Sequence, residues 1–181
     1  MLYNYYKYIR KDDCLRYDIK IMGKEECTAY SLRKLNLNCI IISINDSGYN
    51  TIIHENLKII DVLTLEFDDI GIPIENLKLM TMDDGYKIKN FIDKYKDSIN
   101  NIVVHCTAGI SRSAAVACCL ARYLNGDDTY LFEIGKYIPN KFVYKCLCNA
   151  LNIDYDEESF EEKQLLSGKY LDGDTNLIKI V

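Results

Sequence analysis

The 181-residue sequence predicts an α/β fold, in which a central, mostly parallel sheet of four to five strands is flanked by helices. Three observations support this class. Segments of strand length alternate with segments of helical periodicity, which is typical of parallel sheets covered by helices. Residues Cys39–Ile44 form a nearly continuous apolar run, as expected for a parallel strand buried on both faces. A helix predicted to end at Leu124 is apolar on almost every side, which places it in the middle of the fold.

The first half of the chain contains three predicted strands and one helix. Residues 18–22 alternate in polarity like a half-exposed edge strand, Gly23 ends this strand, and a helix is expected over 25–34. The buried strand follows. Asn45–Asn50 has the composition of a turn and opens a loop to about residue 58, after which residues 59–67 form the next strand.

The second half is mainly helical. Thr81 and Asp84 are placed to form a capping box for a helix that runs to about Ser98. The apolar face of this helix consists of Ile88, Phe91, Ile92 and Tyr95. A strand at 102–105 comes next, followed by the apolar helix, which Asn125, Gly126 and Asp127 close. A further helix presents Tyr130, Leu131, Ile134, Tyr137 and Ile138 on one face, and Pro139-Asn140 then starts a last helix with Val143, Cys146, Leu147, Ala150 and Leu151 aligned.

The composition divides the chain into one domain at 1–153 and an acidic C-terminal extension at 154–181. We expect the acidic run that opens the extension to be a solvated helix. Three roles remain open for the apolar end at 176–181: an added edge strand, docking on the core, or binding of a partner. The tyrosine-rich residues 1–17 are expected to be a partly ordered entry segment that packs against the domain.

Charge and cysteine content exclude several functional classes. The net charge is −5, the isoelectric point is near 5.1, and no basic stripe occurs, which argues against nucleic-acid binding and weakens a membrane-lipid role. No apolar segment approaches the ~18 residues of a membrane span, and the first residues lack the apolar core of a secretion signal. The eight cysteines are therefore expected to be small core residues of a reduced, cytoplasmic protein. With two histidines and no zinc-type spacing, no metal site is expected.

The most informative stretch connects the strand at 102–105 to the apolar helix. It reads His105-Cys106-Thr107-Ala108-Gly109-Ile110-Ser111-Arg112-Ser113, and we call residues 106–112 the anion loop. Its backbone N–H groups can surround a tetrahedral anion beside the positive end of the following helix. Gly109 permits a tight turn or close approach, and the Arg112 guanidinium can grip two oxygens at once. This positive environment favours the thiolate of Cys106, a nucleophile aimed at a bound phosphate.

The pattern His105-Cys106-x5-Arg112-Ser113 resembles the signature loop of the cysteine-dependent protein tyrosine phosphatases, and the intervening residues resemble most closely the dual-specificity branch. The resemblance implies that Cys106 is the nucleophile and that Ser113 steadies the thiolate as it leaves. It implies that phosphate is held by Arg112 and by the backbone amides of Thr107, Ala108, Gly109, Ile110, Ser111 and Arg112. His105 resembles a residue that orients the loop. Asn140 matches an asparagine that braces it, although Asn140 also suits a helix N-cap.

The resemblance further calls for a carboxylic acid that protonates the leaving oxygen. Asp69, 37 residues before Cys106, aligns best with the acid of the family, and Asp68 is the reserve candidate. The chain has no tryptophan, so the Trp-Pro-Asp loop of the larger tyrosine-specific enzymes is absent. The resemblance implies no cofactor.

We therefore expect a protein phosphatase acting on phosphotyrosine, and on phosphoserine and phosphothreonine if its pocket is shallow. The expected partner is a phosphorylated protein, and the enzyme is expected to be a monomer. We expect it to be of the small type found in bacteria or viruses, because its richness in Asn, Ile, Lys and Tyr indicates an AT-rich genome. Two alternatives remain open: a phosphatase for phosphoinositides or RNA 5′-phosphates, and a phosphate-binding pseudophosphatase. Tyr49 and His54 are either on the lip of the substrate site or simply exposed to solvent.

Overall fold

Four strands form one parallel sheet within residues 17–171, the part of the chain that the computed structural model describes. The strands are β1 (Asp18–Gly23), β2 (Cys39–Asn45), β3 (Ile59–Glu66) and β4 (Asn101–Cys106). They lie side by side in the order β1-β4-β2-β3, and each neighbouring pair is parallel. The predicted parallel sheet is confirmed, with β1 at one edge as its alternating polarity indicated.

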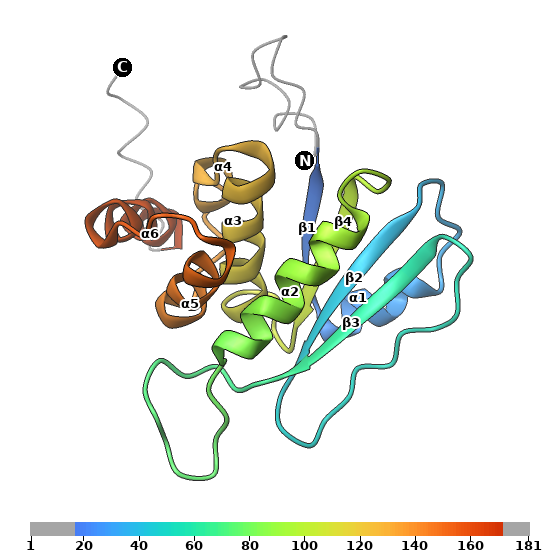
Figure 1. The fold of residues 1–181 in the computed structure, drawn as a ribbon, viewed down its shortest axis with the longest axis horizontal. Coiled ribbons are helices and arrows are strands. Elements are labelled where there is room, and N and C mark those ends of the chain that lie inside the picture. Colours follow the sequence, from blue (N-terminus) through green and yellow to red (C-terminus); the bar gives the residue numbers. More distant parts are fainter. Residues whose placement is uncertain (1–16, 172–181) are drawn as a thin grey trace, which may run out of the picture.

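The helices cover both faces of this sheet. They are α1 (Lys24–Ser31), α2 (Met82–Tyr95), α3 (Arg112–Asn125), α4 (Thr129–Phe132), α5 (Lys141–Leu151) and α6 (Glu157–Leu171). Figure 1 shows α1 behind the sheet and α2, α3 and α5 on the opposite side. Helix α3 packs against β1, β4 and α5, so the most apolar helix does lie in the middle of the fold.

The side-chain alternation of β2 explains why this strand must be apolar throughout. Ile40, Ile42 and Ile44 join the large core beneath α2 and α3. Ile41 points to the other face, where it packs with Val103 in a smaller cluster that also holds Cys27 of α1. The seven cysteines among the described residues are all buried, which confirms their prediction as core residues.

Two helix ends follow from the local sequence as predicted. The Thr81 hydroxyl accepts a hydrogen bond from the Asp84 backbone N–H, and the Asp84 carboxylate accepts one from the backbone N–H of Thr81. This is the expected capping box of α2. At the end of α3, Gly126 adopts a left-handed conformation with φ of 85° and its N–H reaches the Arg122 carbonyl.

The helix predicted to extend to Ile138 is wrong in length, because α4 ends at Phe132. Gly135 has a φ of 71°, which interrupts helical geometry. The chain then runs back to the anion loop, where the Ile138 N–H donates to the Ile110 carbonyl over 3.0 Å. The apolar periodicity of this segment reflects packing of an irregular chain, not a continuous helix.

The helix predicted for the acidic run forms and its glutamates are exposed, but it is not solvated on every side. This helix, α6, docks on α4 and the core. Phe160 is only 3% exposed and its ring lies 5.8 Å from that of Phe132. Lys163 pairs with the buried Asp128 over 2.5 Å. Phe160 and Lys163 thus anchor one side of the helix, although the average composition of the segment is polar.

The predictions for residues 1–16 and for the apolar end at 176–181 lie outside the described residues. Between residues 17 and 171, the helices are too short or too polar to cross a membrane.

Candidate active site

The anion loop lies at the carboxyl edge of the sheet, as its sequence predicted. Strand β4 ends at Cys106, whose register partner Gly23 is the last residue of β1. Helix α3 begins at Arg112. The loop therefore lies between a strand end and a helix N-terminus, and both the N–H groups and the helix dipole favour a negative ligand there.

Gly109 has both of its expected properties, a conformation that permits a tight turn and a close approach to neighbouring backbone. Its φ is 73°, a left-handed conformation, and a Cβ atom at this position would lie 2.5 Å from the Gly23 nitrogen and 2.6 Å from the Met22 carbonyl carbon. Any larger residue would push the loop away from the end of β1. The close approach keeps the loop tightly curved around the Cys106 thiol.

The thiol of Cys106 is buried at the base of the loop. Its sulfur accepts a hydrogen bond from the Gly109 N–H over 3.3 Å and lies 3.1 Å from the Ser113 hydroxyl oxygen. Both groups can donate a hydrogen bond to a thiolate, which stabilises the charged form of the sulfur.

The Arg112 side chain is buried, and three neighbours hold its guanidinium in position. Its Nη1 donates to the Phe67 carbonyl over 2.7 Å, and its Nη2 donates to the Thr107 hydroxyl over 3.1 Å. Nη2 also forms an ion pair of 2.6 Å with the Asp46 carboxylate. The Nε–H is buried without a hydrogen-bond partner among the described residues. An orphaned cationic donor of this kind suits an oxyanion ligand.

His105 lies under the loop and is fully buried. Its Nε2 lies 2.7 Å from the Ser43 hydroxyl oxygen on β2, so the ring connects two neighbouring strands. Burial lowers the pKa of His105 to about 4, and the nearby Arg112 charge acts in the same direction. The imidazole is therefore neutral at pH 7 and adds no positive charge next to the anion loop.

This pKa predicts how stability depends on pH. Because the folded pKa of about 4 is below the usual 6.5, the unfolded chain binds the proton first as the pH falls, and stability drops between pH 6.5 and 4. The loss from pH 7 to pH 4.5 should be about 2 kcal/mol. Urea unfolding at both pH values measures it, and His105→Gln, whose amide can still reach Ser43, should remove that part of the loss.

His54→Gln is the matched control, since His54 is the only other histidine and is exposed to solvent. Its stability should keep the wild-type dependence on pH. An equal pH dependence in His105→Gln and wild type would show that His105 is not the responsible group.

The two candidate acids follow β3 and have different environments. The Asp68 carboxylate is buried and accepts hydrogen bonds from the Lys78 N–H over 2.7 Å and from both the N–H and the hydroxyl of Ser47. These bonds, that of Lys78 above all, lower the pKa of Asp68. The Asp69 carboxylate is exposed and accepts a hydrogen bond of 2.8 Å from the Ser111 hydroxyl, so it contacts the anion loop directly.

Asn140 has both of the contacts considered for it. Its Oδ1 accepts from the Val143 N–H at the start of α5, which is an N-cap. Its Nδ2 donates to Asp69 over 2.8 Å, and its backbone N–H donates to the Ser111 carbonyl over 3.3 Å. One residue thus links α5, the loop after β3 and the anion loop.

Sequence patterns did not reveal the contacts that β2 and the turn after it make around the anion loop. Ser43 contacts His105, Ser47 contacts Asp68, and Asp46 contacts both Arg112 and Thr107. The signal was present, because Asp46 follows the carboxyl end of a buried strand just as Asp68 follows β3. Because the residues around Asp46 have the composition of a turn, the pattern indicates a turn residue there and not part of the site.

Tyr49 and His54, the two candidates for the edge of the substrate site, have different neighbours. Tyr49 is 73% exposed and belongs to the same turn as Asp46, whose carbonyl accepts its N–H. His54 is exposed as well, and its backbone N–H donates to the Ser31 hydroxyl on α1.

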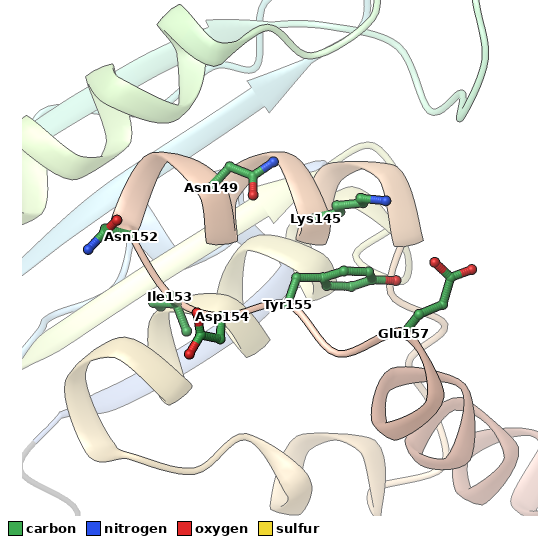
Figure 2. A pocket seen from close by; sticks show the side chains of 7 residues that line it. All are labelled: Lys145, Asn149, Asn152, Ile153, Asp154, Tyr155 and Glu157. Atoms are coloured by element: carbon green, nitrogen blue, oxygen red, sulfur yellow. The ribbon is translucent and has the colours of Figure 1, made fainter.

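A separate surface cavity of about 530 Å³ lies at the end of α5 (Figure 2). It is lined by Lys145, Asn149, Asn152, Ile153, Asp154, Tyr155 and Glu157, none of which belongs to the anion loop. Among residues 17–171, no group of three or more His, Cys, Asp or Glu side chains is arranged to hold a metal ion.

Comparison with known proteins identifies a matching family model. The model of the family described as dual specificity phosphatase, catalytic domain, matches residues 23–124. No curated protein sequence matches the chain.

Several solved structures are similar in fold. The human tyrosine phosphatase-like serine/threonine/tyrosine-interacting protein shares 19% identity, with a TM-score of 0.46 over 84% of this chain and 93% of that one. PTPMT1, solved in complex with PI(5)P, shares 17% identity, with a TM-score of 0.48 over 74% of this chain and 87% of that one. A variant of human DUSP28 shares 12% identity, with a TM-score of 0.43 over 90% and 95% of the two chains.

Proposed function

The chain belongs to the dual specificity phosphatase family, and from this premise we propose that it hydrolyses phosphotyrosine in protein substrates through a cysteinyl-phosphate intermediate. Two observations on the anion loop carry the proposal. The Cys106 thiol accepts the Gly109 N–H, and the buried Arg112 Nε–H has no hydrogen-bond partner within the described part of the chain. The loop thus carries a nucleophile and a cationic oxyanion donor at one end of a parallel sheet, where ligands of such folds bind.

In the first chemical step the Cys106 thiolate attacks phosphorus, so that an S–P bond forms as the P–O bond to the tyrosine ring breaks. The negative charge that spreads over the equatorial oxygens is stabilised by Arg112 and by the loop amides from Thr107 to Arg112. Asp69 donates its proton to the departing phenolate oxygen. The first product is a neutral tyrosine side chain.

In the second step a water molecule attacks the cysteinyl phosphate, and the Asp69 carboxylate accepts a proton from this water. An O–P bond forms, the S–P bond breaks, and inorganic phosphate and the thiolate are released. The Ser113 hydroxyl, 3.1 Å from the sulfur, stabilises the thiolate as it leaves.

The charges near the loop favour a protein phosphomonoester over a polyanionic substrate. Thr107, Ala108, Ile110 and Ser111 are uncharged, so within the loop Arg112 is the cationic side chain. The side chains that contact the loop from the turn after β2 and from the segment after β3 include the carboxylates of Asp46 and Asp69. Phosphoinositides and RNA 5′-triphosphates carry several additional negative charges, which this surrounding would repel.

A substrate panel tests the proposal. We expect the full-length protein, in the presence of a chelator, to release phosphate from phosphotyrosine peptides with a higher kcat/KM than from phosphoserine peptides, phosphoinositide vesicles or RNA 5′-phosphates. Faster release from either of the last two would replace the protein substrate by that class. Binding of phosphopeptides with no release from any substrate would instead identify a pseudophosphatase.

A further inference from the structure

Asp46 is held in a rigid turn at the end of β2. The buried side chain of Asn45 accepts hydrogen bonds of 2.8 Å from both the N–H and the hydroxyl of Thr51, which closes the turn. Inside it, the Asp46 carbonyl accepts the Tyr49 N–H over 3.0 Å. Ser47 attaches the same turn to the buried Asp68. The position of the Asp46 carboxylate is therefore determined by the surrounding fold.

This carboxylate contacts both ends of the anion loop. Its Oδ1 lies 2.6 Å from the Arg112 Nη2, and its Oδ2 accepts the Thr107 hydroxyl over 2.6 Å. Arg112 is almost completely buried, with 4% of its side chain exposed, whereas 37% of the Asp46 side chain remains exposed. An anionic group thus lies at the mouth of a loop whose other features favour an anion.

The hydrogens of the guanidinium show that Asp46 and phosphate require the same donor. Nη2 carries two hydrogens and has two acceptors, Thr107 and Asp46, while Nη1 donates to Phe67. A side-on grip of two phosphate oxygens uses the Nε–H together with the neighbouring Nη2–H. Nε is without a partner among the described residues, but Nη2 must give up an existing bond.

We propose that Asp46 is a specificity-determining residue, which competes with the substrate phosphate for Arg112 and so disfavours substrates that carry a second anionic group beside the phosphate. The inference rests on the proposed function of the same loop. Two effects act together: the carboxylate occupies a donor that phosphate needs, and its charge repels the phosphate dianion and acidic groups next to it.

Binding of inorganic phosphate to the full-length protein, measured by calorimetry, tests the competition without any turnover. Asp46→Asn keeps the size of the side chain and removes its charge, so its Kd should fall about tenfold below that of the wild type. Asp46→Ser should change the Kd in the same direction, whereas Asp46→Glu should stay near wild type. An unchanged or higher Kd in both Asp46→Asn and Asp46→Ser would overturn the proposal.

Asp18→Asn is the charge-matched control. Asp18 is an exposed aspartate at the first position of β1, which lies at the opposite end of the strand from Gly23, the partner of Cys106. Its replacement changes the net charge equally and should leave the phosphate Kd unchanged. A tenfold change in this variant would show that net charge, not the position of Asp46, sets the affinity.

A kinetic measurement tests the specificity. The two substrates are phosphotyrosine peptides with acidic or with neutral flanking residues. The wild type should have a lower KM for the peptides with neutral flanking residues, and Asp46→Asn should reduce this difference in KM several-fold. An unchanged preference would contradict the assigned role. If the wild type hydrolyses none of these peptides, the proposed function fails, and the phosphate Kd values still decide whether Asp46 competes for Arg112.

Discussion

Replacing Cys106 with serine is expected to lower kcat on phosphotyrosine by ~10⁴-fold or more. The loss follows because a serine hydroxyl remains protonated at neutral pH and no base in the loop is placed to activate it, whereas the thiol receives the Gly109 N–H and lies beside Ser113. Single-turnover phosphate release from a phosphotyrosine peptide measures the effect.

Binding separates loss of chemistry from loss of structure. The Cys106→Ser protein should still bind inorganic phosphate, since Arg112 and the loop amides are unchanged. Cys146→Ser is the matched control: this thiol is also buried but contacts Met82 of α2 and is not part of the loop. Turnover by Cys106→Ser at the rate of the control would exclude a cysteinyl-phosphate mechanism.

Replacing Asp69 with asparagine is expected to lower kcat on phosphotyrosine by ~10²–10³-fold. The amide cannot donate a proton to the phenolate, but it can still accept the hydrogen bonds that Ser111 and Asn140 give to Asp69. The loss should therefore appear in kcat and not in phosphate affinity. The decline of the rate at high pH, which reflects deprotonation of the acid, should disappear with it.

The leaving group provides a sharper measurement of the same role. An aryl phosphate with an acidic phenol needs little protonation as it leaves, so the penalty of Asp69→Asn should shrink on such a substrate. A penalty of equal size on phosphotyrosine and on this aryl phosphate would contradict the role of Asp69 as the acid.

Asp68→Asn distinguishes the two neighbouring aspartates. Hydrogen bonds from Lys78 and Ser47 lower the pKa of Asp68 and occupy both of its carboxylate oxygens, which disfavours the protonated form that an acid needs. Its replacement should destabilise the loop after β3 but keep the fall of the rate at high pH. If Asp68→Asn loses that fall and Asp69→Asn retains it, Asp68 is the acid.

The local elements of the site could be predicted because each depends on neighbours in the chain. A β-branched strand before Cys106, a glycine at 109 and an apolar helix from Arg112 are properties of consecutive residues, and so is the Thr81 capping box. The same local patterns did not predict where α4 ends or that α6 docks on the core. After α4, Gly135 interrupted the helix although the apolar period continues, and in α6 the burial of Phe160 docked a helix of acidic composition on the core.

The sequence by itself determined the family, the strand–loop–helix that carries Cys106 and Arg112, and the parallel sheet around it, because residue type, spacing and periodicity encode these directly. Only the tertiary structure decided which carboxylates reach the loop. Asp46 and Thr107 are 61 residues apart in sequence and meet because β2 and β4 are neighbours in the sheet. Strand order and register set such contacts, and these arise from packing of the whole domain, which no local pattern records.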